Sequence, residues 1–160
     1  MFAKPTAEHD FFKPFLGEWS MEHRCDMGPD QPPAVSRGKM TGRSLGGLWT
    51  LLESSGEMPD GGVGYSLFTL GYDPTRKLYH GTFVASMMTH LWLYQGSVNA
   101  AGNILTLDVE GPSFDGLGMA SYQDIFEVVN NDHWILRSRM LNKETGNWVN
   151  FLEGHHHRLK

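Results

Sequence analysis

The chain has 160 residues, of which 40% are hydrophobic and 19% charged, so we expect one soluble globular domain spanning residues 1–160. The formal net charge of −5 argues against nucleic acid as a partner, because nucleic-acid binding needs a basic face that neutralises phosphates. No apolar run approaches the roughly 20 residues of a membrane span. The single cysteine, Cys25, excludes an internal disulfide, and the first residues lack the apolar stretch of a signal peptide, so we expect a cytoplasmic protein.

The first element that the sequence predicts is a short helix or turn over residues 8–16. Phe12, Phe15 and Leu16 fall on one helical face, where they can cap the mouth of a barrel. The internal Pro14 keeps this element short or irregular, because proline disrupts helical hydrogen bonding.

Gly17-Glu18-Trp19 follows directly and opens the first predicted strand. A Gly-x-Trp near the start of a chain of this length resembles the opening of lipocalin-like (calycin) β-barrels, in which the indole plugs one end of the barrel. In calycins an arginine from a late strand often packs across this tryptophan. The resemblance therefore implies a cation–π contact between Trp19 and Arg158 with a structural role.

After Trp19 the hydrophobic pattern changes to a period of two, and turn residues such as Asp73-Pro74-Thr75-Arg76 separate the segments. Short strands joined in sequence predict an antiparallel up-and-down arrangement, and closure into a barrel removes the exposed edges. The predicted strands cover residues 19–26, 36–46, 48–56, 64–72, 77–86, 90–98, 103–110, 119–130, 133–142 and 147–158.

The alternation within the strands predicts which side chains face the interior. In strand 103–110, Leu105, Leu107 and Val109 share the inner face. Strand 90–98 is apolar on both faces, with Leu91 and Leu93 opposite the aromatic side chains of the strand. We therefore expect the N-terminal segment or a partner subunit to cover its outer face.

Several longer phrases resemble a bacterial family of lipocalin-like barrels, the domain-of-unknown-function family 1579, over nearly the whole chain. This resemblance implies an all-β fold, a lipocalin-like up-and-down antiparallel barrel of about ten strands with a short N-terminal helix or cap. It implies no assigned activity. The phrases are Leu16-Gly17-Glu18-Trp19 with His9 ahead of it, Ser44-Leu45-Gly46-Gly47-Leu48-Trp49, Leu70-Gly71-Tyr72-Asp73-Pro74, Tyr79-His80-Gly81-Thr82-Phe83-Val84-Ala85-Ser86, Leu91-Trp92-Leu93-Tyr94-Gln95-Gly96, Glu110-Gly111-Pro112 and a final strand ending in Arg158.

A barrel of this size usually encloses one small-molecule cavity, and residues on the inner faces of the strands are candidates for binding a ligand there. In the last three strands the face is open to two interpretations. Asp124, Arg137 and Glu153 either point into the barrel or lie outside it in cross-strand pairs. The candidate ligand-binding residues are Met40, Trp49, Ser86, His90, Trp92, Tyr94, Tyr122, Asp124, Arg137, Glu153 and His155.

Histidines offer a second set of candidates, although we expect no cofactor. His155 and His157 stand at i and i+2, a spacing that zinc sites on β-strands use, with a third ligand to come from a residue such as His80, His90 or His133. Haem bound through His133 or His155 is a further alternative. Otherwise these are solvated surface histidines.

The sequence contains no nucleophile elbow, phosphate loop or dinucleotide fingerprint, which ranks binding above catalysis. The leading hypothesis is a barrel that binds a small, largely apolar molecule. The rival is an isomerase- or hydrolase-like enzyme that uses an interior carboxylate, Asp124 or Glu153, as a base with a pKa raised by burial. A purely structural protein is a third class. Apolar Leu91 and Leu93, together with the Phe11, Phe12 and Phe15 cluster, further predict a homodimer, unless the N-terminal segment covers Leu91 and Leu93 within one chain.

Overall fold

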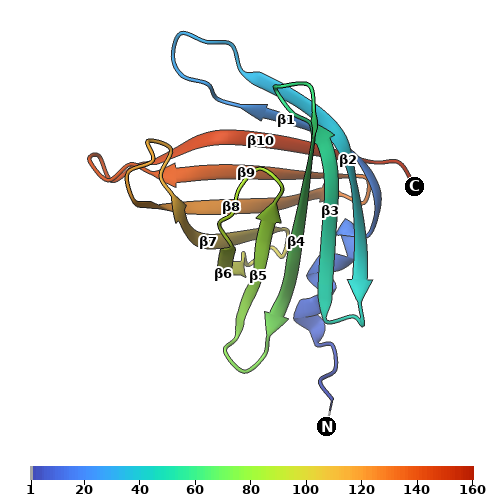
Figure 1. The fold of residues 1–160 in the computed structure, drawn as a ribbon. Helices are drawn as coiled ribbons and strands as arrows, with labels where there is room; N and C mark the ends of the chain where they lie inside the picture. The colour runs from blue at the N-terminus through green and yellow to red at the C-terminus, as the bar shows by residue number, and fades with distance from the viewer. Residues whose placement is uncertain (1) are drawn as a thin grey trace.

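The structure is a computed structural model that describes residues 2–160. Its strands form a closed antiparallel barrel in the order β1-β10-β9-β8-β7-β6-β5-β4-β3-β2 (Figure 1). This confirms the predicted up-and-down barrel, and each strand bound lies within two residues of the predicted one. The strands are β1 (Gly17–Cys25), β2 (Ala34–Leu45), β3 (Trp49–Glu57), β4 (Val63–Asp73), β5 (Leu78–Ala85), β6 (Trp92–Val98), β7 (Ile104–Pro112), β8 (Met119–Asn130), β9 (His133–Leu141) and β10 (Trp148–Arg158).

The barrel closes through β1, which pairs with β2 on one side and with β10 on the other. Trp19 lies opposite Met40 of β2 and Arg158 of β10. The register shifts at two places, between Val128 and Asn130 in β8 and between Asn150 and Leu152 in β10. Such bulges exchange the inner and outer faces of the residues beyond them.

The inner faces of the strands form the core. Leu105, Leu107 and Val109 are buried as the alternation predicts, and Met40 is buried on β2. Phe126 joins the core from β8 with a fully buried ring. The period of two in the sequence thus identifies the core face of these strands, because successive side chains of a strand point to opposite sides.

The N-terminal element is the 3₁₀ helix η1 (Ala7–Phe15), which lies at one end of the barrel (Figure 1). Its Phe12 and Phe15 are buried, and the Phe15 ring packs at 4.9 Å from the ring of Trp134. A Cβ on Gly42 of β2 would lie 2.0 Å from the Phe15 carbonyl oxygen, so this close approach of η1 requires glycine. The helix is therefore the cap that the sequence predicts.

Trp19 and Arg158 join this cap to the barrel. The Arg158 guanidinium carbon lies 4.2 Å from the centre of the Trp19 ring. The guanidinium also donates to the carbonyl oxygens of Leu16 at 2.7 Å and Pro14 at 3.0 Å. The indole nitrogen of Trp19 donates to the Phe15 carbonyl at 2.9 Å. The contact implied by the calycin resemblance is present, and it holds η1 in place.

Strand β6 keeps an uncovered outer face. Leu91 is 50% exposed and Leu93 is 63% exposed, because the N-terminal segment lies at the barrel end and not against this strand. The predicted cover by the N-terminal segment is therefore wrong. Among the described residues, no helix has the length and hydrophobicity to cross a membrane.

Candidate ligand-binding cavity

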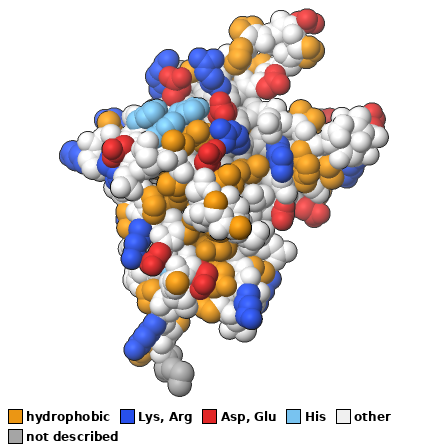
Figure 2. All heavy atoms as spheres, turned by 180° about the vertical axis from the view of Figure 1, so that it is seen from behind, with side chains coloured by type: hydrophobic (Ala, Val, Ile, Leu, Met, Phe, Trp, Pro, Cys, Tyr) orange, Lys and Arg blue, Asp and Glu red, His pale blue; other side chains and the backbone are white. Residues whose placement is uncertain are grey.

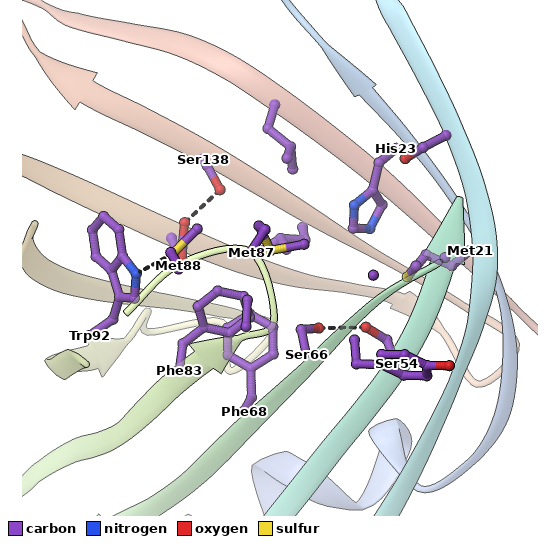
Figure 3. A pocket seen from close by; sticks show the side chains of 18 of the residues that line it. Met21, His23, Ser54, Ser66, Phe68, Phe83, Met87, Met88, Trp92 and Ser138 are labelled. Carbon is purple, nitrogen blue, oxygen red and sulfur yellow. Dashed lines mark hydrogen bonds between the residues drawn. The ribbon is translucent and has the colours of Figure 1, made fainter. Parts of the chain in front are cut away.

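The interior of the barrel holds a cavity of about 330 Å³ (Figure 3). Its mouth lies at the end opposite η1, where the β3–β4, β5–β6 and β7–β8 loops contribute Met58, Met87, Met88 and Phe114. Its walls are mainly apolar, and the volume falls at the lower end of the range of small-molecule pockets, about 300–1,000 Å³. Further apolar side chains that line it are Met21, Met40, Phe68, Phe83, Trp92, Tyr94, Tyr122, Leu136, Phe151 and Leu152.

A hydrogen-bonded carboxylate lies on one wall of this cavity. Asp124 of β8 accepts a hydrogen bond from the Tyr94 hydroxyl of β6 on one oxygen, and from the Ser138 hydroxyl of β9, at 2.5 Å, on the other. The three side chains meet because all of them lie on the inner faces of their strands. Asp124 itself is half-buried, and since it lines the cavity, its remaining exposure is toward that space.

Burial determines the electrostatics of this cluster. Removal from water raises the pKa of the Asp124 carboxyl, and the hydrogen bonds from Ser138 and Tyr94 oppose that rise. Burial, together with the neighbouring Asp124, raises the pKa of the Tyr94 hydroxyl well above its ordinary value. Tyr94 is therefore a neutral donor at neutral pH, and Asp124 is a carboxyl group that gains from a ligand able to supply a further hydrogen bond.

A second polar region faces the cavity from β1, β3 and β4 (Figure 3). Ser54 and Ser66 hydrogen-bond to each other at 2.5 Å. The His23 Nε2 atom lies 3.4 Å from Nε2 of His156, whose ring stacks on Trp134 at 3.6 Å between centroids. Burial lowers the pKa of His23 to about 4, so this imidazole is neutral at pH 7.

Comparison with known proteins assigns the chain to a family. Residues 4–158 match the family described as "Protein of unknown function (DUF1579)". The chain belongs to this family. The resemblance drawn from the sequence phrases is thereby confirmed, and it carries a fold without an assigned activity. No curated protein matches the chain.

Solved structures resemble the DUF1579 barrel at low identity. Rv2717c from M. tuberculosis is 11% identical with a TM-score of 0.70, covering 98% of this chain and 100% of its own. The S-type phycobiliprotein lyase CPES from Guillardia theta is 10% identical with a TM-score of 0.61, covering 97% and 94%. EF1p2_mFAP2b bound to DFHBI is 11% identical with a TM-score of 0.51, covering 95% and 99%. At these identities the likeness shows the fold alone.

The DUF1579 barrel brings five of the candidate residues to its cavity, namely Met40, Trp92, Tyr94, Tyr122 and Asp124. Their strands alternate regularly through these positions. Tyr122 also donates from its hydroxyl to the Pro112 carbonyl at 2.6 Å, and the Trp92 indole nitrogen lies 2.9 Å from the sulfur of Met88. No bulge lies between these residues and the buried positions of their own strands, so they share the inner face that those positions define in the structure.

Trp49, Ser86 and His90 do not line the cavity. Thr50 is the inward residue at the start of β3, so Trp49 points outward, where its ring stacks on His80 at 5.1 Å. Ser86 and His90 lie in the loop between β5 and β6, where strand alternation no longer holds. Ser86 accepts a hydrogen bond from the Tyr65 amide, and His90 lies 3.0 Å from the Glu110 carbonyl oxygen.

Arg137, Glu153 and His155 lie on the outer face of β9 and β10. Buried Leu136 and Ser138 fix the inner face of β9, so Arg137 between them points outward. It forms ion pairs with Glu127 at 2.6 Å and with Glu153 at 3.0 Å. The interior interpretation of Arg137 and Glu153 is wrong, and the cross-strand alternative is the one that the structure adopts.

Among the polar cavity residues that the candidate set lacks, His23 and Ser138 had a signal in the sequence. His23 follows Trp19 and Met21 at intervals of two on β1, and Ser138 follows Trp134 and Leu136 in the same way on β9. The face of Trp19 therefore predicted that of His23. The Ser54–Ser66 pair carried no such signal, because small hydroxyl side chains occur on either face of a strand.

His133, His155 and His157 come together on the outer face of β9 and β10, while His80 and His90 lie on other strands and loops. Neither His133 nor His155 faces the cavity, since inward His156 lies between the outward His155 and His157. Neither residue is therefore placed to ligate a haem held inside the barrel.

Proposed function

We propose that this DUF1579 protein is a cytoplasmic binding protein that holds one small, largely apolar molecule in the barrel cavity. The observation that carries the proposal is a cavity of about 330 Å³ with mainly apolar walls and the hydrogen-bonded carboxyl group of Asp124 on one of them. Pockets for small molecules have this composition, in which apolar surface supplies affinity and a few polar groups fix orientation. The methionines at its mouth suit ligands of irregular shape, because the unbranched thioether side chain adapts its conformation.

The Asp124 cluster indicates the polar part of the ligand. Each carboxyl oxygen of Asp124 already accepts one protein hydrogen bond, from Tyr94 or from Ser138, and each retains a further lone pair. A ligand hydroxyl or N–H group that donates to Asp124 would use this capacity. We therefore propose an apolar ligand with one hydrogen-bond donor, whose body lies against Phe68 and Phe83.

The fold of the comparison structures is compatible with this use of the interior. EF1p2_mFAP2b is bound to DFHBI, and CPES is a phycobiliprotein lyase. Both share the barrel fold of this chain. They support the class of function, not the identity of the ligand.

The test fills the cavity with a larger side chain and compares the ligand retained by this variant with that retained by the wild type and by a control variant. Ala85 lines the cavity from β5, and the next residue back, Val84, is exposed on the outer face of the same strand. Native mass spectrometry of freshly purified protein should show a bound small molecule in the wild type and in Val84→Phe, and none in Ala85→Phe. Equal binding of an apolar fluorescent dye by all three proteins would contradict an interior site.

A second candidate function is supported by the contact between Asp124 and Tyr94. A carboxylate that lines a cavity beside a tyrosine hydroxyl is an arrangement that can transfer a proton to or from a bound substrate, with Asp124 as the base. The experiment is to return the extracted small molecule to the wild-type protein and to Asp124→Asn in excess. Conversion to an isomer or a hydrolysis product by the wild type alone favours the enzyme, and recovery of the unchanged molecule favours the binding protein.

We also propose a homodimer that covers the outer face of β6. Leu91 and Leu93 are at least half exposed there, and Trp49 and Trp148 line the adjoining outer groove. Contiguous exposed apolar side chains usually mark an interface, and two-fold dimers are the commonest oligomers.

A further inference from the structure

The outer face of β9 and β10 carries a cluster of three histidine side chains that point away from the cavity. His133 begins β9, and it lies directly opposite His157 in the pairing with β10. His155 precedes His157 by two residues and therefore points to the same side. Figure 2 shows histidine side chains gathered on the surface, with acidic and basic side chains beside them.

The nitrogen atoms of these three rings converge. One ring nitrogen from each residue lies within 4.8 Å of the others. The closest approach is 2.9 Å, between Nε2 of His133 and Nδ1 of His155. The rings of His133 and His157 lie 4.4 Å apart between centroids. In a tetrahedral zinc site, metal–nitrogen distances of about 2.0–2.1 Å imply nitrogen–nitrogen distances of about 3.3 Å. The three rings are stacked, with interplanar angles of 26°, 19° and 13°, so the side chains have to rotate for all three nitrogens to point at one ion at that spacing.

Glu153 orients one of the rings. Its Oε2 atom lies 3.5 Å from Nε2 of His155, and its Oε1 atom accepts a hydrogen bond from Arg137 at 3.0 Å. A carboxylate on one ring nitrogen of a histidine favours the tautomer with hydrogen on that nitrogen and leaves the other nitrogen as the ligand. The free nitrogen of His155 is then Nδ1, which is the atom that faces His133.

We propose that His133, His155 and His157 bind one divalent transition-metal ion, Zn²⁺, on the outer face of β9 and β10. His133 supplies Nε2, and His155 supplies Nδ1, with its remaining hydrogen directed to Glu153. With a hydrogen already on Nε2 of His155, the hydrogen between the two facing nitrogens is that of His133 Nε2, and binding of the ion moves it to Nδ1 of His133, so that both rings stay neutral. Three histidine nitrogens leave the fourth position of a tetrahedral ion open to water, since His157 is exposed.

This site is independent of the ligand cavity. His156, which lies between His155 and His157, points inward and stacks on Trp134, so the metal and the interior ligand occupy opposite sides of one sheet. The ion would also connect the beginning of β9 with the end of β10.

The first experiment is a calorimetric titration of chelator-treated protein with Zn²⁺. The wild type should bind one equivalent, and His133→Ala and His157→Ala should weaken that binding at least tenfold. His90→Ala, on a distant loop, should leave it unchanged. Glu153→Gln should weaken it about tenfold while retaining the stoichiometry, because loss of a carboxylate partner of a ligating histidine typically costs 10–100-fold in affinity.

A second measurement keeps the proposal testable if a variant folds poorly. Co²⁺ bound by three histidines and water should give the visible absorption bands of a four-coordinate ion in the wild type and in His90→Ala. These bands should be absent from His157→Ala, whose exposed side chain is the least involved in packing. The proposal is overturned if the wild type takes up no Zn²⁺ in the titration. It is equally overturned if uptake persists in a folded His133→Ala, His157→Ala double variant.

Discussion

At the scale of single residues, Asp124 is the group whose ionisation opposes folding. Its pKa is raised by burial, so its contribution to stability is present below the ordinary carboxyl pKa and is lost as the pH rises through the raised value in the folded protein. Asp124→Asn removes this loss. We expect the stability of the variant relative to wild type to increase between pH 4 and pH 7, as measured by urea unfolding at several pH values. A difference that is constant with pH would contradict a raised pKa.

His23 has the opposite dependence. Its pKa is lowered by burial from 6.5 to about 4, so its contribution to stability is present above pH 6.5 and is lost as the pH falls toward 4. The wild type should therefore lose about 1–3 kcal/mol more stability than His23→Gln over this interval, since each pKa unit corresponds to about 1.4 kcal/mol. Urea unfolding at several pH values measures this loss of stability. His80→Gln, on the outer surface, serves as the control and should lose as much stability as the wild type.

At the scale of elements, the attachment of η1 depends on the shape of the Arg158 side chain. Its planar guanidinium stacks on Trp19 and reaches the Leu16 and Pro14 carbonyls at once. Lysine retains the charge but not the planar fork, so Arg158→Lys should lower the free energy of unfolding by about 1–3 kcal/mol. Arg76→Lys, at an exposed hydrogen bond to Gln95, should change it by less than about 0.5 kcal/mol. Thermal unfolding of both variants and of the wild type measures these two changes in stability.

At the scale of the whole molecule, the uncovered face of β6 predicts association. Light scattering at micromolar concentration should give about twice the 18.0 kDa mass of one chain. Leu93→Asp should return the mass to that of a single chain, because it places a charge in the proposed interface, whereas Val35→Asp on the exposed face of β2 should not. A wild-type mass near 18.0 kDa would show that the face stays open to solvent and that the dimer proposal is wrong.

The barrel and much of its interior were predictable because local rules fix them. Turn residues set the limits of the strands, and a period of two separated core from surface wherever one face was clearly apolar, as around Leu105 and Leu107. Tyr94 and Tyr122 reached the cavity as predicted for the same reason. The prediction failed at Ser86 and His90, where a loop interrupts the strand and alternation has no meaning.

By itself, then, the sequence determined a closed antiparallel barrel with an N-terminal cap, because alternation, turns and cap residues are local properties. Only the tertiary structure decided that Asp124 points inward and Arg137 outward, since both faces of these strands carry polar side chains. The bulge between Val128 and Asn130 also separates Arg137 from the assignments made earlier in the chain. The meeting of His133 with His155 and His157 likewise depends on the register of β9 against β10. This pairing contains the bulge between Asn150 and Leu152, which shifts the register beyond the hairpin loop and which alternation in the sequence does not reveal.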